Sequence, residues 1–184
     1  MNTKNTSGFS LIELLVVVAL IGIITAMGVP AFNEYTLKSR ITYSYNNILG
    51  GINYTRNTAI SLNTDIDLCA KGSALVCSGN KTWEMGWISS LSETDYTRVG
   101  DDTSEYVTVR AYDTNGDPIT DITFDSQGYP DQAPIVFVVC VPAMEADDAK
   151  AIIINSIGRT QRAYDQNDDG IPEDMNGDPI VCSA

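Results

Sequence analysis

The sequence contains no histidine, so it lacks the side chain that most often moves protons at neutral pH and most often binds transition metals. It also contains no Gly-x-Ser-x-Gly turn, and nothing in its pattern holds a serine or an aspartate beside a general base. Positive charge is scarce, because 11 Lys and Arg stand against 24 Asp and Glu, which gives a formal net charge of −13. We therefore expect no enzymatic activity and no required cofactor, and we expect most of the surface to repel nucleic acid and acidic lipid.

The chain has four cysteines, Cys69, Cys77, Cys140 and Cys182, but no C-x-x-C pair. An even number without metal-ligand spacing favours two disulfides in an oxidising compartment. Four cysteines allow three pairings. We favour Cys69 with Cys77, which closes a short loop, and Cys140 with Cys182, which ties the tail to a buried strand. The alternative is four reduced thiols or an adventitious metal site, which would have no histidine as a co-ligand.

A long apolar run, Phe9–Phe32, follows a short polar start. As a helix it is sufficient to cross a hydrocarbon layer of about 30 Å. Lys4 is the one charge before the run, and it favours an N-terminus that stays in the cytoplasm. We therefore expect a single-pass anchor, with the remainder of the chain in the periplasm. Gly22, Gly28 and Pro30 weaken the helix and predict a bend or a locally melted stretch.

One carboxylate, Glu13, interrupts this apolar run. An unpaired charge inside a membrane costs about 2.5 to 3.5 kcal/mol, so Glu13 needs a partner. If the chain were cut after Gly8, the new α-amino group of Phe9 would lie one helical turn away. In a packed bundle of helices, the carboxylate could then neutralise the amine of a neighbouring subunit.

The run Gly8-Phe9-Ser10-Leu11-Ile12-Glu13 resembles the class III signal of type IV pilins and type II secretion pseudopilins. In that family a membrane peptidase cuts after the glycine and methylates the new N-terminal phenylalanine, and the glutamate guides docking into the filament. The resemblance implies a leader peptide at residues 1–8, cleavage between Gly8 and Phe9, N-methylation of Phe9, and an assembly role for Glu13. The alternative is an ordinary signal anchor whose glutamate faces the lipid headgroups.

The helix is predicted to continue over residues 33–62, where apolar side chains recur at intervals of three, four or seven. Gly50-Gly51 is the weakest point of this prediction, since each glycine costs about 1 kcal/mol relative to alanine. Close approach of a strand would explain the pair. Short strands separated by turns are predicted beyond this helix, over residues 64–69, 83–88, 106–112, 119–124, 135–141 and 151–157. The last two are continuous apolar runs, which are typical of strands buried on both faces.

Several later segments resemble the GspH/FimT/FimU group of minor pilins and pseudopilins, namely residues 54–60, 66–69, 83–88, 122–128 and 157–159. The resemblance implies an α+β, pilin-like fold in which a long N-terminal helix, transmembrane in its first half, packs on antiparallel β-sheets. The expected organisation is a leader at 1–8, a transmembrane segment at 9–32, an amphipathic continuation at 33–62, and a β-domain at 63–184 that ends in an acidic tail.

The function implied is that of a minor type IV pilin that helps to start filament assembly at or near the pilus tip, in motility, adhesion or DNA uptake. The first alternative is an H-like subunit of a type II secretion pseudopilus. A DNA-binding receptor at the pilus tip is an alternative from another class. The expected partners are other pilin or pseudopilin subunits, the prepilin peptidase, and lipid of the bacterial inner membrane before assembly. The β-domain would lie in the periplasm before assembly and in the pilus or pseudopilus after it.

The acidic tail, which begins at Asp165, carries oxygen ligands at alternate positions before a glycine, as calcium loops do. Asp165, Asn167 and Asp169 would be side-chain ligands of Ca²⁺, and Glu173 or Asp174 would complete the shell. The helices that flank an EF-hand are missing from the pattern. The alternative is a solvated acidic loop with turn-forming residues.

Two cations, Arg159 and Arg162, lie close together in the sequence. Some FimT-like proteins are DNA receptors that use arginines in a C-terminal loop resembling this one. Two arginines supply only a few phosphate contacts, however, and the many acids oppose them. The alternative is the end of a strand whose arginines pair with neighbouring carboxylates.

Overall fold

A computed structural model describes residues 9–73, 75–77, 79, 81–92, 95–103, 106–142, 148–174 and 176–182. The chain forms two compact units, the first ending at Leu37 and the second beginning at Lys38. The predicted leader, including Gly8, lies outside the described residues.

One long helix, α1 (Leu11–Leu62), contributes residues to both units. It stays helical through Gly22, Gly28 and Pro30, so the melted stretch predicted there is absent. A proline inside a helix removes one amide donor, and the hydrogen bonds of the turns on either side can hold the chain in the helical conformation.

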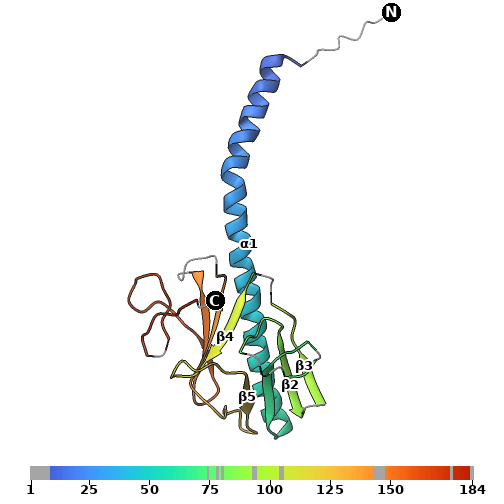
Figure 1. The fold of residues 1–184 in the computed structure, drawn as a ribbon, viewed down its shortest axis with the longest axis vertical. Helices are drawn as coiled ribbons and strands as arrows, with labels where there is room; N and C mark the ends of the chain where they lie inside the picture. Colours follow the sequence, from blue (N-terminus) through green and yellow to red (C-terminus); the bar gives the residue numbers. More distant parts are fainter. Residues whose placement is uncertain are drawn as a thin grey trace, which may run out of the picture. The chain divides into compact units, whose positions relative to one another are not determined.

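In the second unit, one face of α1 is buried against two β-sheets (Figure 1). The buried positions follow the helical repeat, as they do in an amphipathic helix. They are Ile41, Ser44, Ile48, Gly51, Ile52, Thr55 and Ala59.

Each sheet has four strands, and all their pairings are antiparallel. The first sheet has the order β3-β2-β1-β5 and the second the order β4-β6-β7-β8. The strands are β1 (Ile66–Ala70), β2 (Trp87–Ser92), β3 (Asp95–Val99), β4 (Thr108–Tyr112), β5 (Asp121–Phe124), β6 (Ile135–Cys140), β7 (Lys150–Ile154) and β8 (Thr160–Arg162). A long helix packed on two antiparallel sheets is the fold expected from the sequence.

The predicted strand over residues 83–88 is wrong in its first half. Strand β2 begins only at Trp87, because the chain turns at Gly86, which has φ 90° and whose amide donates to the carbonyl of Trp83 at 3.1 Å. Trp83 is instead a buried loop residue. Its indole Nε1 donates to the carbonyl of Ile119 at 3.0 Å, and its ring packs edge-on against Phe137 of β6.

Strands β3 and β8 escaped prediction. The residues of β3 are mostly exposed and include charged side chains, so they carry no alternation of apolar and polar positions. Strand β8 has only three residues. Both lie at the edge of a sheet, and their pairing with β2 and β7 is what defines them as strands.

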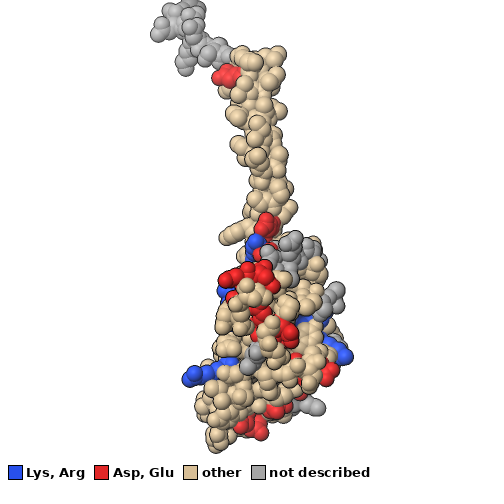
Figure 2. Space-filling view, turned by 90° about the vertical axis from the view of Figure 1, so that its left-hand side faces the viewer, with Lys and Arg blue, Asp and Glu red and all other residues tan. Residues whose placement is uncertain are grey.

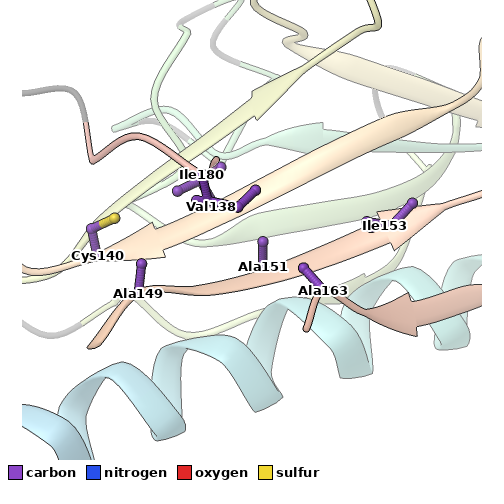
Figure 3. Close-up of a cluster of buried hydrophobic side chains, with 7 residues drawn as sticks. All are labelled: Val138, Cys140, Ala149, Ala151, Ile153, Ala163 and Ile180. Atoms are coloured by element: carbon purple, nitrogen blue, oxygen red, sulfur yellow. The ribbon is translucent and has the colours of Figure 1, made fainter. Parts of the chain in front are cut away.

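Strands β6 and β7 are buried on both faces, as their apolar sequences predict. A cluster of small and branched side chains covers the outer face of the second sheet. In Figure 3 the side chains of Ala149, Ala151 and Ala163 point away from the helix. Ile180 from the tail lies in the same cluster and is 4% exposed. The tail therefore forms a third layer over this sheet. The cluster consists of Val138, Cys140, Ala149, Ala151, Ile153, Ala163 and Ile180.

Two disulfides are present, with the favoured pairing. Cys69 bonds to Cys77 across eight positions, and Cys140 of β6 bonds to Cys182 across 42 positions. On the loop-entropy model, the longer loop contributes about 4 kcal/mol and the shorter about 2.5 kcal/mol. The alternative of four reduced thiols is not what the structure shows.

Four tight turns share one construction. In each, the side chain of the first residue accepts hydrogen bonds from the amides two and four positions later, and a glycine at the fourth position has a positive φ. The turns span residues 113–117, 125–129, 155–159 and 174–178. In two of them the turn leads into the same run, Asn-Gly-Asp-Pro-Ile, at residues 115–119 and 176–180. This short repeat is a feature that sequence reasoning missed.

The helical glycine pair has a specific explanation at Gly51. A Cβ atom added there would lie 2.5 Å from Cε2 of Trp87 on β2, whereas one added at Gly50 would meet nothing within 4 Å. The Trp87 indole also donates from Nε1 to the side-chain oxygen of Asn47 at 3.0 Å. Close approach of β2 to the helix therefore requires a glycine at position 51 and not at position 50.

These two glycines give a matched test of the packing. Gly51→Ala should destabilise the β-domain by about 1 to 3 kcal/mol, because the indole must move. Gly50→Ala should leave its stability unchanged or raise it by up to about 1 kcal/mol, because alanine favours the helix. Urea unfolding followed by tryptophan fluorescence measures both. Equal effects of the two substitutions would contradict the close packing of Trp87 on α1.

Candidate functional sites

The first unit exposes an apolar surface. Every described residue from Phe9 to Tyr35 is exposed, and the helix shows almost no charge in Figure 2. The helix is long and apolar enough to cross a membrane, and none of its apolar window is buried within the chain. An apolar surface of this size in water would be strongly unfavourable, so it requires lipid or other apolar helices around it.

Glu13 forms a hydrogen bond at the beginning of its own helix. Helix α1 begins at Leu11, so Ser10 is the N-cap residue and Glu13 is the third helical residue. The backbone amide of Ser10 donates to Oε2 of Glu13 at 3.4 Å, which is half of a capping box. The carboxylate therefore lies at the positive end of the helix dipole, beside the residue that becomes the N-terminus if the leader is cut. Sequence reasoning missed this contact, although the Ser-x-x-Glu spacing is its signal.

Three carboxylates of the tail come together in a group. Oxygen atoms of Asp165, Asp169 and Glu173 all lie within 4.8 Å of one another. Asn167 belongs to the same loop, where its Oδ1 accepts from the amide of Asp169 at 2.8 Å. The structure thus brings together three of the residues that the calcium pattern predicts, and Asn167 lies in the same loop.

Of the two residues suggested for completing that shell, Glu173 lies in the group and Asp174 does not. Oδ1 of Asp174 accepts instead from the amides of Asn176 and Asp178, at 2.7 and 3.0 Å, and so builds a separate turn. The sequence alone could not separate these neighbouring acids, because the choice depends on where the next turn begins.

The two arginines proposed for DNA lie at the edge of the second sheet. Arg159 is exposed at the end of a turn, and its backbone amide donates to Oδ1 of Asn155 at 2.9 Å. Arg162, also exposed, belongs to β8. Burial lowers the pKa of Lys150, and the charge of Arg162 lowers it further, so these two cations lie near each other. No salt bridge of either arginine is found among the described residues.

The repeated turns at 113–117 and 174–178 border a cavity of about 390 Å³. Its lining includes Asp113, Asp174 and Asp178, together with Val136 and Val138 of β6. The pKa of Asp113 is lowered by hydrogen bonds from the backbone amides of its own turn, chiefly that of Asp117. The carboxylate of Asp113 therefore stabilises its own turn.

An exposed apolar helix that continues into a domain of two antiparallel sheets defines a pilin-like subunit. Residues 44–158 match the family model described as type II transport protein GspH, which is more than half of the chain. Residues 3–29 match the prokaryotic N-terminal methylation motif. The chain belongs to the GspH family and carries a class III prepilin leader.

Individual relatives agree with this assignment. The chain is 46% identical to a fimbrial protein of Pseudomonas aeruginosa over 39 residues, 21% of this chain and 25% of that protein. It is 49% identical to the type IV major fimbrial protein FimA of Dichelobacter nodosus over 35 residues, 19% of this chain and 22% of that protein. The chain thus spans about a quarter of the length of these curated relatives.

A solved structure resembles most of the chain. The type IV minor pilin FimU of Pseudomonas aeruginosa matches with a TM-score of 0.54 and 19% identity, over 72% of this chain and 91% of that one. At this identity the likeness shows the fold. The matched methylation motif covers the predicted cleavage site between Gly8 and Phe9.

Cleavage and methylation can be tested directly at the predicted positions. Mass spectrometry of the protein from its own membranes should show a chain that starts at N-methylated Phe9. Gly8→Lys should leave the leader attached, because the bulky cation replaces the glycine at the cut. Ser7→Ala, one position earlier, is the control and should be processed normally. An intact leader on the unaltered protein would contradict the prediction.

Proposed function

We propose that this protein is a minor type IV pilin that acts in the initiation of filament assembly, at or near the tip of the pilus. The observation that carries the proposal is the fold, because a helix packed on two antiparallel sheets matches the minor pilin FimU over 91% of that chain. The proposed role is structural, and it requires no catalysis and no cofactor. The lack of histidine in the sequence supports a non-enzymatic role.

The proposed topology follows from the first unit. The exposed apolar helix would cross the inner membrane once, with the residues before Phe9 in the cytoplasm and the β-domain in the periplasm. During assembly the same surface would leave lipid and pack against the helices of neighbouring subunits. Packing and interhelical polar contacts drive association of helices in membranes, since lipid tails are as apolar as the side chains.

Glu13 would supply the register of that packing. Its carboxylate keeps one intramolecular donor, the Ser10 amide at 3.4 Å, and a carboxylate accepts several hydrogen bonds. In a bundle it would face the α-amino group of a neighbouring subunit, where leaving a buried charge unpaired costs about 3 to 5 kcal/mol. Subunits displaced along the bundle would lose that pair.

A second candidate function is supported by the family model, whose description is that of a type II transport protein. A secretion pseudopilus is built from the same kind of subunit, so the leader and the domain serve either machine. Deletion of the gene, with parallel assays of twitching, transformation and exoprotein secretion, distinguishes them. We expect loss of twitching with secretion retained, and loss of secretion alone would assign the protein to a pseudopilus. Loss of transformation without loss of filaments would favour the DNA receptor.

The register argument gives its own prediction. Glu13→Gln should be processed and inserted normally, yet filaments and the amount of this subunit within them should fall at least about tenfold, because the charge pair is lost. Glu34→Gln makes the same change on the same helix outside the apolar run, and it should assemble normally. Immunoblots of sheared filaments and of membranes measure both. Normal assembly of the Glu13 variant would remove the proposed role of this carboxylate.

A further inference from the structure

We propose that the loop of residues 165–173 binds Ca²⁺, and that the bound ion fastens the acidic tail to the outer face of the second sheet. The proposal rests on the arrangement of the tail itself and is independent of the role proposed for the filament. Failure of one would leave the other standing.

The first observation is the group of three carboxylates. Asp165, Asp169 and Glu173 approach within 4.8 Å through their oxygens, and like charges at this distance repel one another. Backbone amides offset part of this repulsion. Oδ1 and Oδ2 of Asp165 accept from the amides of Asp168 and Gly170, each at 2.7 Å. Oδ1 of Asp165 also accepts from the amide of Asp169 at 3.3 Å, whereas its Oδ2 accepts one hydrogen bond and keeps a second lone pair that a cation can use.

The second and independent observation is the state of Glu173. This side chain is only 2% exposed, and one of its oxygens, Oε2, accepts from the backbone amide of Gln166 at 2.6 Å. The other oxygen, Oε1, is buried and has no hydrogen-bond partner among the described residues. A buried carboxylate oxygen without a partner is costly, and a metal ion is a partner that would satisfy it.

The donor set selects the class of ion. All candidate ligands are oxygens, and the four cysteines are held in disulfides. Asn167 adds an amide oxygen at the third position of the loop, and Ile171 stands at the seventh, where calcium loops use a backbone carbonyl. Ca²⁺ accepts six to eight oxygens in flexible geometry, whereas Mg²⁺ demands a tight octahedron and keeps its waters. A loop of five alternating oxygen donors therefore fits calcium.

The loop is connected to the part of the tail that covers the second sheet, so a bound ion would help to hold that part in place. Glu173 also donates its backbone amide to the carbonyl of Tyr164 at 3.3 Å, and the amide of Ile180 donates to the carbonyl of Pro172 at 2.9 Å. Ile180 packs into the cluster on the outer face of the sheet, and Cys182 bonds to Cys140 of β6. The tail is thus held by the calcium loop at one end and by a disulfide at the other.

Calorimetric titration of the full processed chain in detergent micelles with calcium chloride tests the site. We expect one site with Kd on the order of 10⁻⁴ to 10⁻³ M, the range of extracellular calcium modules. At about 10 mM calcium the melting temperature of the β-domain should rise by about 5 °C, because the folded state alone binds the ion. The rise should disappear with EGTA, and Mg²⁺ at the same concentration should not reproduce it.

Charge-neutral variants identify the ligands. Glu173→Gln and Asp169→Asn should each weaken calcium binding at least about tenfold. Asp178→Asn removes the same charge from the same tail outside the group, and it should bind as the unaltered protein does. Melting temperatures in EGTA show whether each variant folds. Should Glu173→Gln fail to fold, the exposed Asp169→Asn decides the result.

Proteolysis tests the second half of the proposal. Calcium should slow cleavage within residues 165–182 about tenfold, and reducing gels should reveal the released tail that the disulfide otherwise retains. Absence of heat up to about 10 mM calcium, or equal binding by all three variants, would overturn the site. Binding without any protection of the tail would overturn its fastening role.

Discussion

The packing of the second half of α1 against two sheets is the contact on which the rest of the structure depends. Ile41, Ile48 and Ile52 supply a buried stripe along the helix, and Gly51 lets the Trp87 indole lie directly on the helix backbone. The same indole fills the space beside Gly100, where an added Cβ would lie 2.2 Å from its Nε1. Because the Trp87 indole packs so closely against both positions, small residues are required on both sides of it.

The helix itself is one element with two environments. Its described residues up to Tyr35 expose their side chains, whereas from Ile41 onward one face is buried in the domain. A helix that is apolar all round and unburied within its own chain requires lipid or other apolar helices around it. Exposure of this apolar helix to water is unfavourable, and this free energy favours its transfer into lipid or its packing against other helices.

The acidic tail covers the outer face of the second sheet. Antiparallel sheets often leave one face to solvent, but β6 and β7 are apolar on both faces and need a second cover. Ile180 and the disulfide to Cys140 supply that cover from a segment with little regular structure of its own. The carboxylate group at 165–173 lies where this cover begins, which is why a cation there would bear on the integrity of the whole face.

The sequence by itself determined the elements that depend on local chemistry: the apolar helix, the amphipathic continuation, the buried strands, and the alternate oxygen ligands before Gly170. These follow from periodicity and residue type, which need no distant partner.

The tertiary structure alone decided the rest. Strands β3 and β8 exist because neighbouring strands pair with them. Gly51 rather than Gly50 is required because Trp87, far along the chain, lies against it. Glu173 rather than Asp174 joins the carboxylate group because a separate turn uses the second acid. Such choices depend on contacts between residues distant in sequence, and no local pattern contains them.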